Sequence, residues 1–486
     1  MTTTTPAATE TGLRRDAIGL REVLFQSITD MAPGAAIAAS IPAGIAYAGG
    51  SLPLSVLFAL VACLLCAWSI GLLARELPAA GSMATYAARG LHPAIGYLVA
   101  WAYILVGLLI QPLVLLQLGF TTASTINSDF PGYPANLWWP WSLAGAVIIL
   151  AAGFYGIRTS ARLGTILGIT EIAVFAVLAV FFIVHAGGHN TGTVFGTGYT
   201  PSGYRGISGV IGGSVYTILA FGGFEGAAPL AEEARNPRRT IQRAVLLATL
   251  LIGALYVFTT YAVDVAYGPH KFASFSTAGP SSWEGMAKSL YGLFWFFVFL
   301  AIVNSTIANS NAGMNVASRT GYAMGRIGAL PRYLAQISPR HRSPVAAIVT
   351  AFVFTVAVTL GLGLHYNPIV AFSMVGVAIV IPLVAVYILM NAACIGYFAR
   401  QRDRFNWFSH LVIPVLGIAA FVPAWLTAAG IKVFSFVAPL SAPYSYMGPG
   451  VAGWMVVGLI CLIYLYVRHP QRVAEVGLVH LDLDDR

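Results

Sequence analysis

A series of apolar runs, each long enough to cross a membrane as a helix, constrains the fold more than any other feature. A helix needs about 20 apolar residues to span a hydrocarbon core of about 30 Å, where the lipid cannot hydrogen-bond the backbone. The sequence therefore predicts an all-α integral membrane protein with about 12 transmembrane helices. The predicted spans are 25–47, 53–76, 95–124, 139–157, 163–186, 207–231, 242–267, 288–324, 344–364, 368–398, 409–430 and 449–467.

Charged residues are scarce and unevenly distributed. They make up 9% of the 486 residues, against about a quarter in a soluble domain, while hydrophobic residues make up 58%. With the amino terminus inside, all of the 26 Lys and Arg are cytoplasmic except Arg205, Lys271, Lys288 and Lys432. This bias follows the positive-inside rule and predicts a multi-pass protein of the plasma or inner membrane with both termini cytoplasmic. The net charge of +9 is thus explained by the lipid bilayer, without a nucleic-acid partner.

The predicted domains leave no room for a soluble catalytic unit. They are a cytoplasmic tail (1–24), a membrane core of spans 1–10 (25–400), spans 11 and 12 (401–467) and a second cytoplasmic tail (468–486). No metalloprotease, nucleotide-binding or nucleophile motif is present, so we expect neither an enzyme nor a cofactor. Cys63 and Cys66 lie one helical turn apart without a second ligand pair, which favours packing over a metal or redox site.

Two predicted spans contain helix breakers at corresponding positions. Span 1 contains SITDMAPGAAIAASIPAG (27–44), and span 6 contains FGGFEGAAPL (221–230). Broken helices survive in a membrane where their freed backbone groups line a polar cavity or bind a ligand. A pair of breaks five spans apart is typical of a secondary transporter built from a 5+5 inverted repeat. Two ordinary kinks are the alternative.

Three segments resemble permeases of the amino acid, polyamine and organocation (APC) superfamily, of the amino acid permease type. They are GFEGAAPLAEEARNPRRTIQRAV (223–245), ELPAAGSMATYAARGLHPAIGYLVAW (76–101) and NSNAGMNVASRTGYAMGRIGALP (309–331). The resemblance implies a LeuT-like fold, a 5+5 inverted repeat plus two additional helices. It also implies that an amino acid binds at the unwound centres of spans 1 and 6.

The candidate substrate site follows from this resemblance. The span-1 break of the family usually reads G-S-G or G-x-G, whereas here Pro33 and a single glycine stand in its place, which alters how a carboxylate is held. The phenylalanines are expected to form part of a hydrophobic lid, with core packing as the alternative. The candidate residues are Pro33, Gly34, Ala35, Ala36, Phe221, Gly222, Gly223 and Phe224.

Acidic residues inside predicted spans are candidates for gating and coupling, because a charge is costly in a membrane. Glu225 follows the span-6 break, where a carboxylate can cap the second half-helix. It either serves only as this cap or also senses a substrate amine or a proton. Asp30 is a candidate gating residue on the cytoplasmic side of the span-1 break, and Asp264 is expected to be hydrated at an outer interface.

Glu171 is the strongest candidate for coupling. In several proton-coupled or exchanging APC permeases the matching position is a lysine that lies between spans 1 and 8 and substitutes for a sodium ion. A carboxylate here predicts proton coupling, with a protonated, hydrogen-bonded Glu171 as the structural alternative. A polar stripe on span 8 that includes Asn304, Asn309 and Asn311 is expected to face span 1, unless it only links helices.

These features predict an importer that works by alternating access, carrying an amino acid by proton-coupled symport. Sodium is the alternative coupling ion. A polyamine or another organic amine is the alternative substrate, because the predicted buried acids have no clear basic partner. A membrane sensor on the permease fold is a remote alternative, since no output domain is present.

Overall fold

A computed structural model describes residues 18–79, 81–130, 132–134, 136–155, 161–276, 281–326, 330–337 and 343–474. Within these ranges the chain is helical, and the only strand-like pairing is an isolated bridge between Ile18 and Ala234. The predicted all-α membrane architecture is confirmed. Residues 1–17 of the first predicted tail and 475–486 of the second lie outside the described residues.

The main helices follow the apolar runs of the sequence. Span 1 is divided into α1 to α4 and span 6 into α10 and the 3₁₀ helix η6, whereas most other spans are single helices. The bounds are α1 Leu20–Met31, α2 Pro33–Ala35, the π-helical turn η1 Ala36–Ser40, α3 Ile41–Ala43, α4 Ile45–Ala48, α5 Leu52–Glu76, α6 Ser82–Gly90, α7 Pro93–Asp129, α8 Trp139–Tyr155, α9 Ala161–Ala186, α10 Ile207–Phe221, η6 Phe224–Leu230, α11 Pro237–Tyr267, α12 Ser281–Tyr291, α13 Phe294–Arg326, α14 Val345–Tyr366, α15 Pro368–Ala399, α16 Ile413–Ala429, α17 Met447–Arg468 and α18 Pro470–Ala474.

By length and composition, 10 helical segments of the described residues are able to cross a membrane. The first of them, Leu20–Glu76, contains the first two predicted spans, and the apolar helix at Trp139–Phe154 is shorter than the other segments. The chain is therefore a multi-pass membrane protein. The number of twelve spans remains a prediction.

The predicted span 288–324 begins too early. Lys288 belongs to the separate helix α12, and α13 starts at Phe294. Gly292, between the two, has a φ of 56°, a conformation that glycine adopts at little cost. The sequence concealed this break because the residues around Gly292 are as apolar and aromatic as a membrane span.

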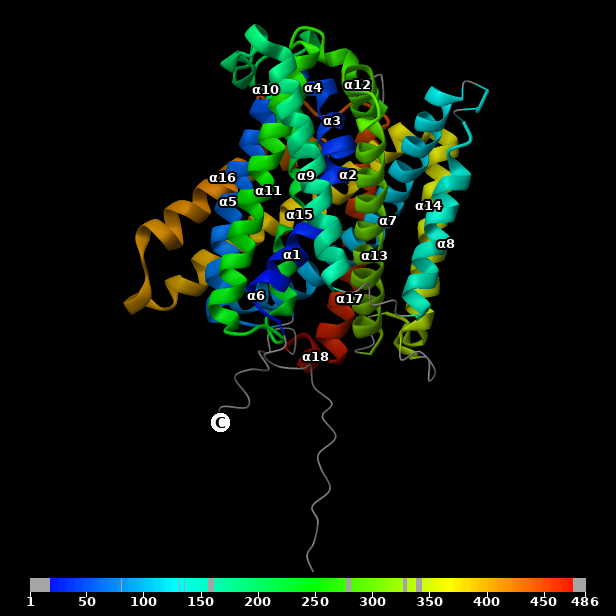
Figure 1. Cartoon of the computed structure of the whole chain (residues 1–486). Helices are drawn as coiled ribbons and strands as arrows, with labels where there is room; N and C mark the ends of the chain where they lie inside the picture. The colour runs from blue at the N-terminus through cyan, green and yellow to red at the C-terminus, as the bar shows by residue number, and fades with distance from the viewer. Residues whose placement is uncertain are drawn as a thin grey trace, which may run out of the picture.

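The divided first span runs through the middle of the bundle (Figure 1). α1 contacts α11 and α13, α2 contacts α9 and α13, and α4 contacts α10. α8 and α14 pack against each other on one side of the bundle, and α16 stands on the opposite side. This arrangement buries the span-1 break among α9, α11 and α13, and the span-6 break lies beside α1 and α11.

A reciprocal tryptophan pair fixes α17 to α7. Trp101 Nε1 donates to the carbonyl of Trp454 at 3.0 Å, and Trp454 Nε1 donates to the carbonyl of Trp101 at 3.2 Å. The two rings stack with their centroids 4.9 Å apart. A side chain at Gly458 would overlap the Trp101 indole, so a glycine is required for this close approach. The pair sets both the register and the rotation of α17 on α7.

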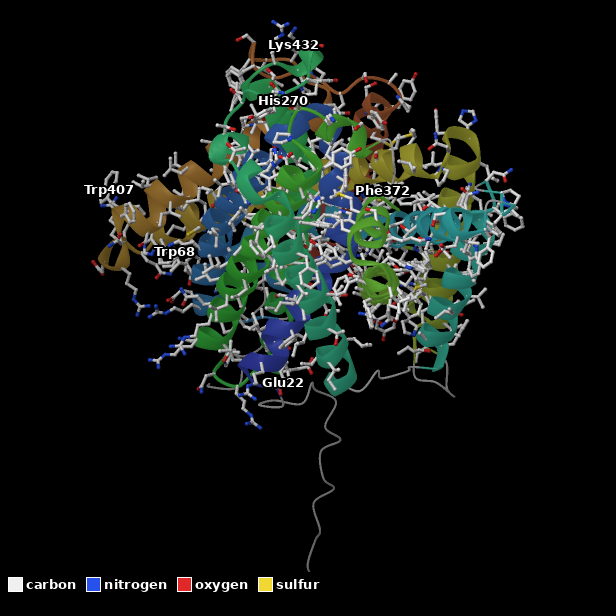
Figure 2. All side chains as sticks on the ribbon, turned by 45° about the horizontal axis from the view of Figure 1, so that its top comes forward. Glu22, Trp68, His270, Phe372, Trp407 and Lys432 are labelled. Atoms are coloured by element: carbon white, nitrogen blue, oxygen red, sulfur yellow. The ribbon has the colours of Figure 1, made fainter. Side chains whose placement is uncertain are left out.

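Charged and polar side chains mark the two ends of the bundle, and apolar side chains mark its flank. Figure 2 shows Glu22 at one end of the molecule and Lys432 with His270 at the other. Trp407, which is 71% exposed, projects from the side of the bundle. Many large apolar side chains on α16 and α17 are also exposed, for example Leu416 and Ile460. A surface of this kind suits the hydrocarbon of a bilayer.

Candidate functional site

The span-1 break lies at Ala32. This residue has a φ of 45° and a ψ of 67°, which ends α1, and Pro33 then starts the next half-helix. A residue before proline avoids the right-handed helical conformation, and proline at the first helical position loses no intrahelical hydrogen bond. The sequence at this position thus ends one helix and starts another within a single residue.

The span-6 break lies at Gly222 and Gly223. Gly223 has a φ of 109°, and a Cβ atom there would stand 2.5 Å from the carbonyl carbon of Asp30. The chain then continues as η6, so the two half-helices of span 6 differ in their winding. Glycine at 223 permits both this backbone conformation and the close approach of α1.

The two breaks lie against each other, as expected from their positions in the sequence. The Ser27 hydroxyl donates to the carbonyl of Phe224 at 2.9 Å and accepts from the N–H of Ala227 at 2.9 Å. Ser27 is fully buried, so these bonds form away from water. They join α1 to the first turn of η6.

Tyr256 of α11 connects the ends of two half-helices. Its hydroxyl lies 3.1 Å from the carbonyl of Met31, the last residue of α1, and 3.0 Å from the carbonyl of Ala220 in α10. Carbonyls at helix ends lack an intrahelical donor. The hydroxyl of one tyrosine is therefore within hydrogen-bonding distance of carbonyls at both breaks. Nothing in the sequence distinguished this residue from the other tyrosines, of which the chain has 22 in all.

The predicted substrate residues are buried around these breaks. Pro33, Gly34, Ala35 and Ala36 are all buried, and Gln117 Nε2 donates to the carbonyl of Ala35 at 2.9 Å. These residues belong to helical turns, so the unwinding of span 1 is confined to Ala32.

The two candidate phenylalanines are fully buried and have aromatic partners. Phe221 meets Tyr256 edge to face at 5.3 Å, and Phe224 lies 5.1 Å from the ring of Tyr387. Gly222 and Gly223 are partly exposed. The rings thus form an apolar wall beside the breaks, in a position that suits both a lid and core packing.

Glu225 is enclosed by hydrogen-bond donors. Its Oε1 accepts from the Tyr103 hydroxyl at 2.8 Å, and its Oε2 accepts from the Tyr387 hydroxyl at 2.9 Å and from the N–H of Gly223 at 3.1 Å. The bond to Gly223 caps the second half-helix of span 6. The two tyrosines, on α7 and α15, were not predicted to take part.

Asp30 lies beside this cluster on α1. Its Oδ1 accepts from Gln26 Nε2 at 2.9 Å, and its Oδ2 occupies the space that a Cβ of residue 226 would take. Gly226 is therefore needed where Asp30 meets η6. The two acids, Asp30 and Glu225, lie near each other on the α1 side of the breaks.

Glu171 lies between spans 1, 5 and 8. It is 4% exposed, and its Oε2 accepts from Asn304 Nδ2 of α13 at 3.2 Å. The carboxylate also faces the Ser305 hydroxyl and the backbone N–H of Gly34. The side chain from α9 thus reaches the first turn after the span-1 break.

The other predicted polar residues contribute less to this cluster. Asn309 and Asn311 are half-buried and form no side-chain hydrogen bond with a described residue. Asn304 is instead the span-8 partner of Glu171. The expectation that Asp264 is hydrated is wrong, because Asp264 is fully buried where the 3₁₀ helix η4 (Gly192–Phe195) covers this end of α11.

Comparison with known proteins identifies the family. The model of the family described as amino acid permease matches residues 18–461. The chain belongs to the amino acid permease family. The resemblance to APC permeases is thereby confirmed, and this permease is a membrane transporter.

Individual relatives of this permease carry different solutes. It is 26% identical to the low-affinity putrescine importer of Escherichia coli, over 78% of this chain and 81% of the relative. It is 24% identical to the branched-chain amino acid permease of Bacillus subtilis, over 89% of each chain. An uncharacterised transporter of Mycobacterium tuberculosis is 28% identical over 92% of each chain.

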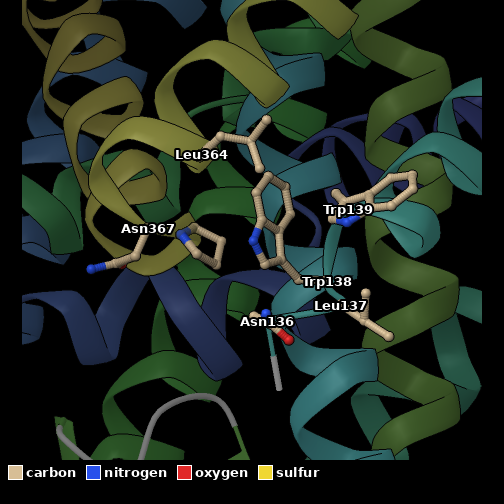
Figure 3. A pocket seen from close by; sticks show the side chains of 8 residues that line it. Asn136, Leu137, Trp138, Trp139, Leu364 and Asn367 are labelled. Carbon is tan, nitrogen blue, oxygen red and sulfur yellow. The ribbon is translucent and has the colours of Figure 1, made fainter. Parts of the chain in front are cut away.

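A surface pocket of about 480 Å³ lies away from the breaks (Figure 3). Trp138 and Trp139 come from the aromatic segment NLWWPW (136–141). Trp138 is 4% exposed and packs below Leu364, whereas Trp139 is 40% exposed. Trp141, the third tryptophan of the segment, is 37% exposed, so the segment has one buried and two exposed rings. The pocket is lined by Asn136, Leu137, Trp138, Trp139, Gly363, Leu364, Asn367 and Pro368.

Proposed function

We propose that this permease imports a small solute that carries an amino group, an amino acid or an organic amine, together with a proton. Transport follows alternating access across the cell membrane, with both termini in the cytoplasm as the charge distribution predicts. The solute binds beside the breaks of spans 1 and 6. The different solutes named for the relatives support a substrate with an amino group without favouring one class.

The position of Glu171 carries the proposal of proton coupling. A carboxylate that is 4% exposed cannot be hydrated, so its ionisation depends on neighbouring dipoles and cations. The neighbours of the carboxylate are Asn304 on α13 and Gly34 at the span-1 break. They belong to two spans that have to separate in alternating access. Movement of span 1 against α13 changes the surroundings of the carboxylate and thereby its affinity for a proton.

Glu171→Gln in proteoliposomes tests this proposal. The wild type is expected to accumulate substrate when the outside is acidic, and to do so equally when choline replaces sodium. The variant keeps the shape and the hydrogen bond to Asn304 but cannot bind and release a proton. It should retain exchange between internal and external substrate and lose accumulation driven by the pH gradient.

Glu284→Gln is the matched control, because Glu284 is also buried but lies on α12, which is not among the candidate membrane spans. It should accumulate substrate as the wild type does. Full pH-driven accumulation by Glu171→Gln would refute Glu171 as the proton site. Loss of uptake by the wild type when choline replaces sodium would indicate that sodium, and not a proton, is the coupling ion.

A further inference from the structure

We propose that the substrate is an organic amine without a carboxylate, and that Glu171 and Glu225 impose this selectivity by occupying the donor ends of both broken helices. The inference rests on the proposed transport function and specifies the substrate class of the same site.

The half-helix after the span-1 break has few N–H groups left for a substrate carboxylate. Pro33 has no N–H, and the N–H of Gly34 faces the carboxylate of Glu171. The N–H of Ala36 donates to the carbonyl of Ala32 at 2.9 Å. The start of a half-helix attracts an anion through such groups. Here the protein supplies the anion itself.

The half-helix after the span-6 break is capped in the same way. The N–H of Gly223 donates to Glu225 Oε2 at 3.1 Å, and the N–H of Glu225 faces its own carboxylate. The next two N–H groups, of Gly226 and Ala227, donate to the carbonyl of Gly223 and the hydroxyl of Ser27. A second internal carboxylate thus occupies the other site at which a substrate anion would bind.

The backbone carbonyls at the ends of α1 and α10 attract cations. The carbonyls of Met31 and Ala220 share one hydrogen from Tyr256, although each oxygen has two lone pairs. These carbonyls lie at the negative ends of α1 and α10, which favour a positive charge.

The ionisable side chains around the two breaks are acidic and therefore also attract cations. Asp30, Glu171 and Glu225 surround the breaks, and no Lys or Arg is among the buried residues of the described ranges. A zwitterionic amino acid would bring its carboxylate against the carboxylate of Glu225 and, until Glu171 has bound its proton, against that of Glu171. Like charges at close range oppose binding. An amine cation meets the acidic side chains and the carbonyls of Met31 and Ala220.

Aromatic rings complete a surface that suits the hydrocarbon part of an amine. Phe224 and Tyr387 lie with their centroids 5.1 Å apart, next to the carboxylate of Glu225. A cation near an aromatic face gains further attraction in a site shielded from water. The combination of acids, carbonyls and rings therefore favours an alkylammonium ion over a zwitterion.

Uptake of matched pairs tests the proposal. The pairs are putrescine with ornithine, cadaverine with lysine, and 3-methylbutylamine with leucine, each differing only by the carboxylate. Proteoliposomes are given labelled members of each pair, and every compound is also tested as a competitor. In at least one pair the amine should be taken up and should compete about tenfold more strongly than its amino acid.

Variants then assign the selectivity to residues. Glu171→Gln and Glu225→Gln should each reduce the preference for the amine, measured by competition during exchange, which needs no pH gradient. Glu284→Gln should leave the preference unchanged. Equal or stronger competition by the amino acids in the wild type, or no competition by any of the three amines, would overturn the proposal.

The outcome separates this inference from the proposed function. Amino acid accumulation driven by a pH gradient would support proton-coupled import and reject the amine. Amine exchange without any response to a pH gradient would support the amine and reject proton coupling.

Discussion

Individual residues of the site are satisfied mainly by partners distant in sequence. Glu225 is bound by tyrosines 122 residues before it and 162 residues after it. The sequence predicted that Glu225 caps a half-helix because that interaction is local. It could not predict Tyr103 or Tyr387, because a tyrosine in an apolar helix is a common packing residue and its partner depends on tertiary structure.

Removing the Tyr256 hydroxyl should destabilise the protein without a change in packing. Tyr256→Phe leaves the edge-to-face contact with Phe221 and removes the donor to the carbonyls of Met31 and Ala220. We expect a loss of about 1 to 2 kcal/mol in stability, because buried carbonyls lose their donor. The measurement is the melting temperature of the purified protein in detergent.

Tyr261→Phe is the control on the same helix. Its hydroxyl is at the exposed end of α11, 3.4 Å from Asn190 Oδ1, so its loss should have little effect. A melting temperature for Tyr256→Phe equal to that of Tyr261→Phe would argue against a structural role of the shared hydrogen bond.

At the scale of helices, the sequence predicted the breaks of spans 1 and 6 because proline and glycine act locally on the backbone. The kind of break was harder to predict. Span 1 leaves the right-handed helical conformation at Ala32 and continues through the π-helical turn η1, whereas span 6 rewinds as a 3₁₀ helix. The difference arises from packing against α1, which no local sequence pattern describes.

Adjacent glycines in span 6 should tolerate substitution differently. Gly223→Ala places a side chain at a φ of 109° and against the backbone of Asp30, whereas Gly222 has a φ of −52°. A Cβ at Gly222 would meet the Leu219 carbonyl oxygen and the flexible Leu383 side chain, each at 3.1 Å, which is less close than the 2.5 Å contact at Gly223. We expect Gly223→Ala to reduce the free energy of unfolding by about 1 to 2 kcal/mol or more relative to Gly222→Ala, because a residue with a side chain pays this cost in left-handed backbone. The melting temperature of Gly223→Ala should therefore be the lower of the two.

Expression level and melting temperature of the two glycine variants, measured side by side, provide the comparison. Equal stability of both would mean that span 6 relaxes at Gly223 and that the close approach of Asp30 is dispensable.

At the scale of the whole molecule, stability is expected to depend on an acid outside the membrane spans. Glu284 on α12 is 4% exposed, and neither of its carboxylate oxygens has a hydrogen-bond partner within the described ranges. Burial raises the pKa of Glu284 from 4.5 to about 8. The folded protein therefore holds this proton more tightly than the unfolded chain does.

The stabilising effect of that proton is full below the ordinary pKa of 4.5 and is lost as the pH rises toward 8. Glu284→Gln keeps a neutral side chain at every pH. Its melting temperature should equal that of the wild type near pH 5 and exceed it at pH 8 to 9. A difference between the two proteins that does not vary with pH would show that Glu284 is ionised in the folded state at both values.

The overall fold was predictable because a long apolar run in the local sequence is enough to indicate a membrane span. The site depends on contacts among spans that are distant in sequence. Glu171 was placed near span 8 by resemblance, yet its partner Asn304 and its approach to Gly34 required the packing of α2, α9 and α13. The Gly292 break was concealed by its apolar neighbours.

The paired indoles of Trp101 and Trp454 have a practical consequence for observing transport. Two reciprocal hydrogen bonds and a stack prevent α17 from rotating or sliding on α7 unless all three contacts break. Cys461 lies on α17 and is the only cysteine that is not fully buried. A spectroscopic label attached there would report the displacement of α7 during the transport cycle.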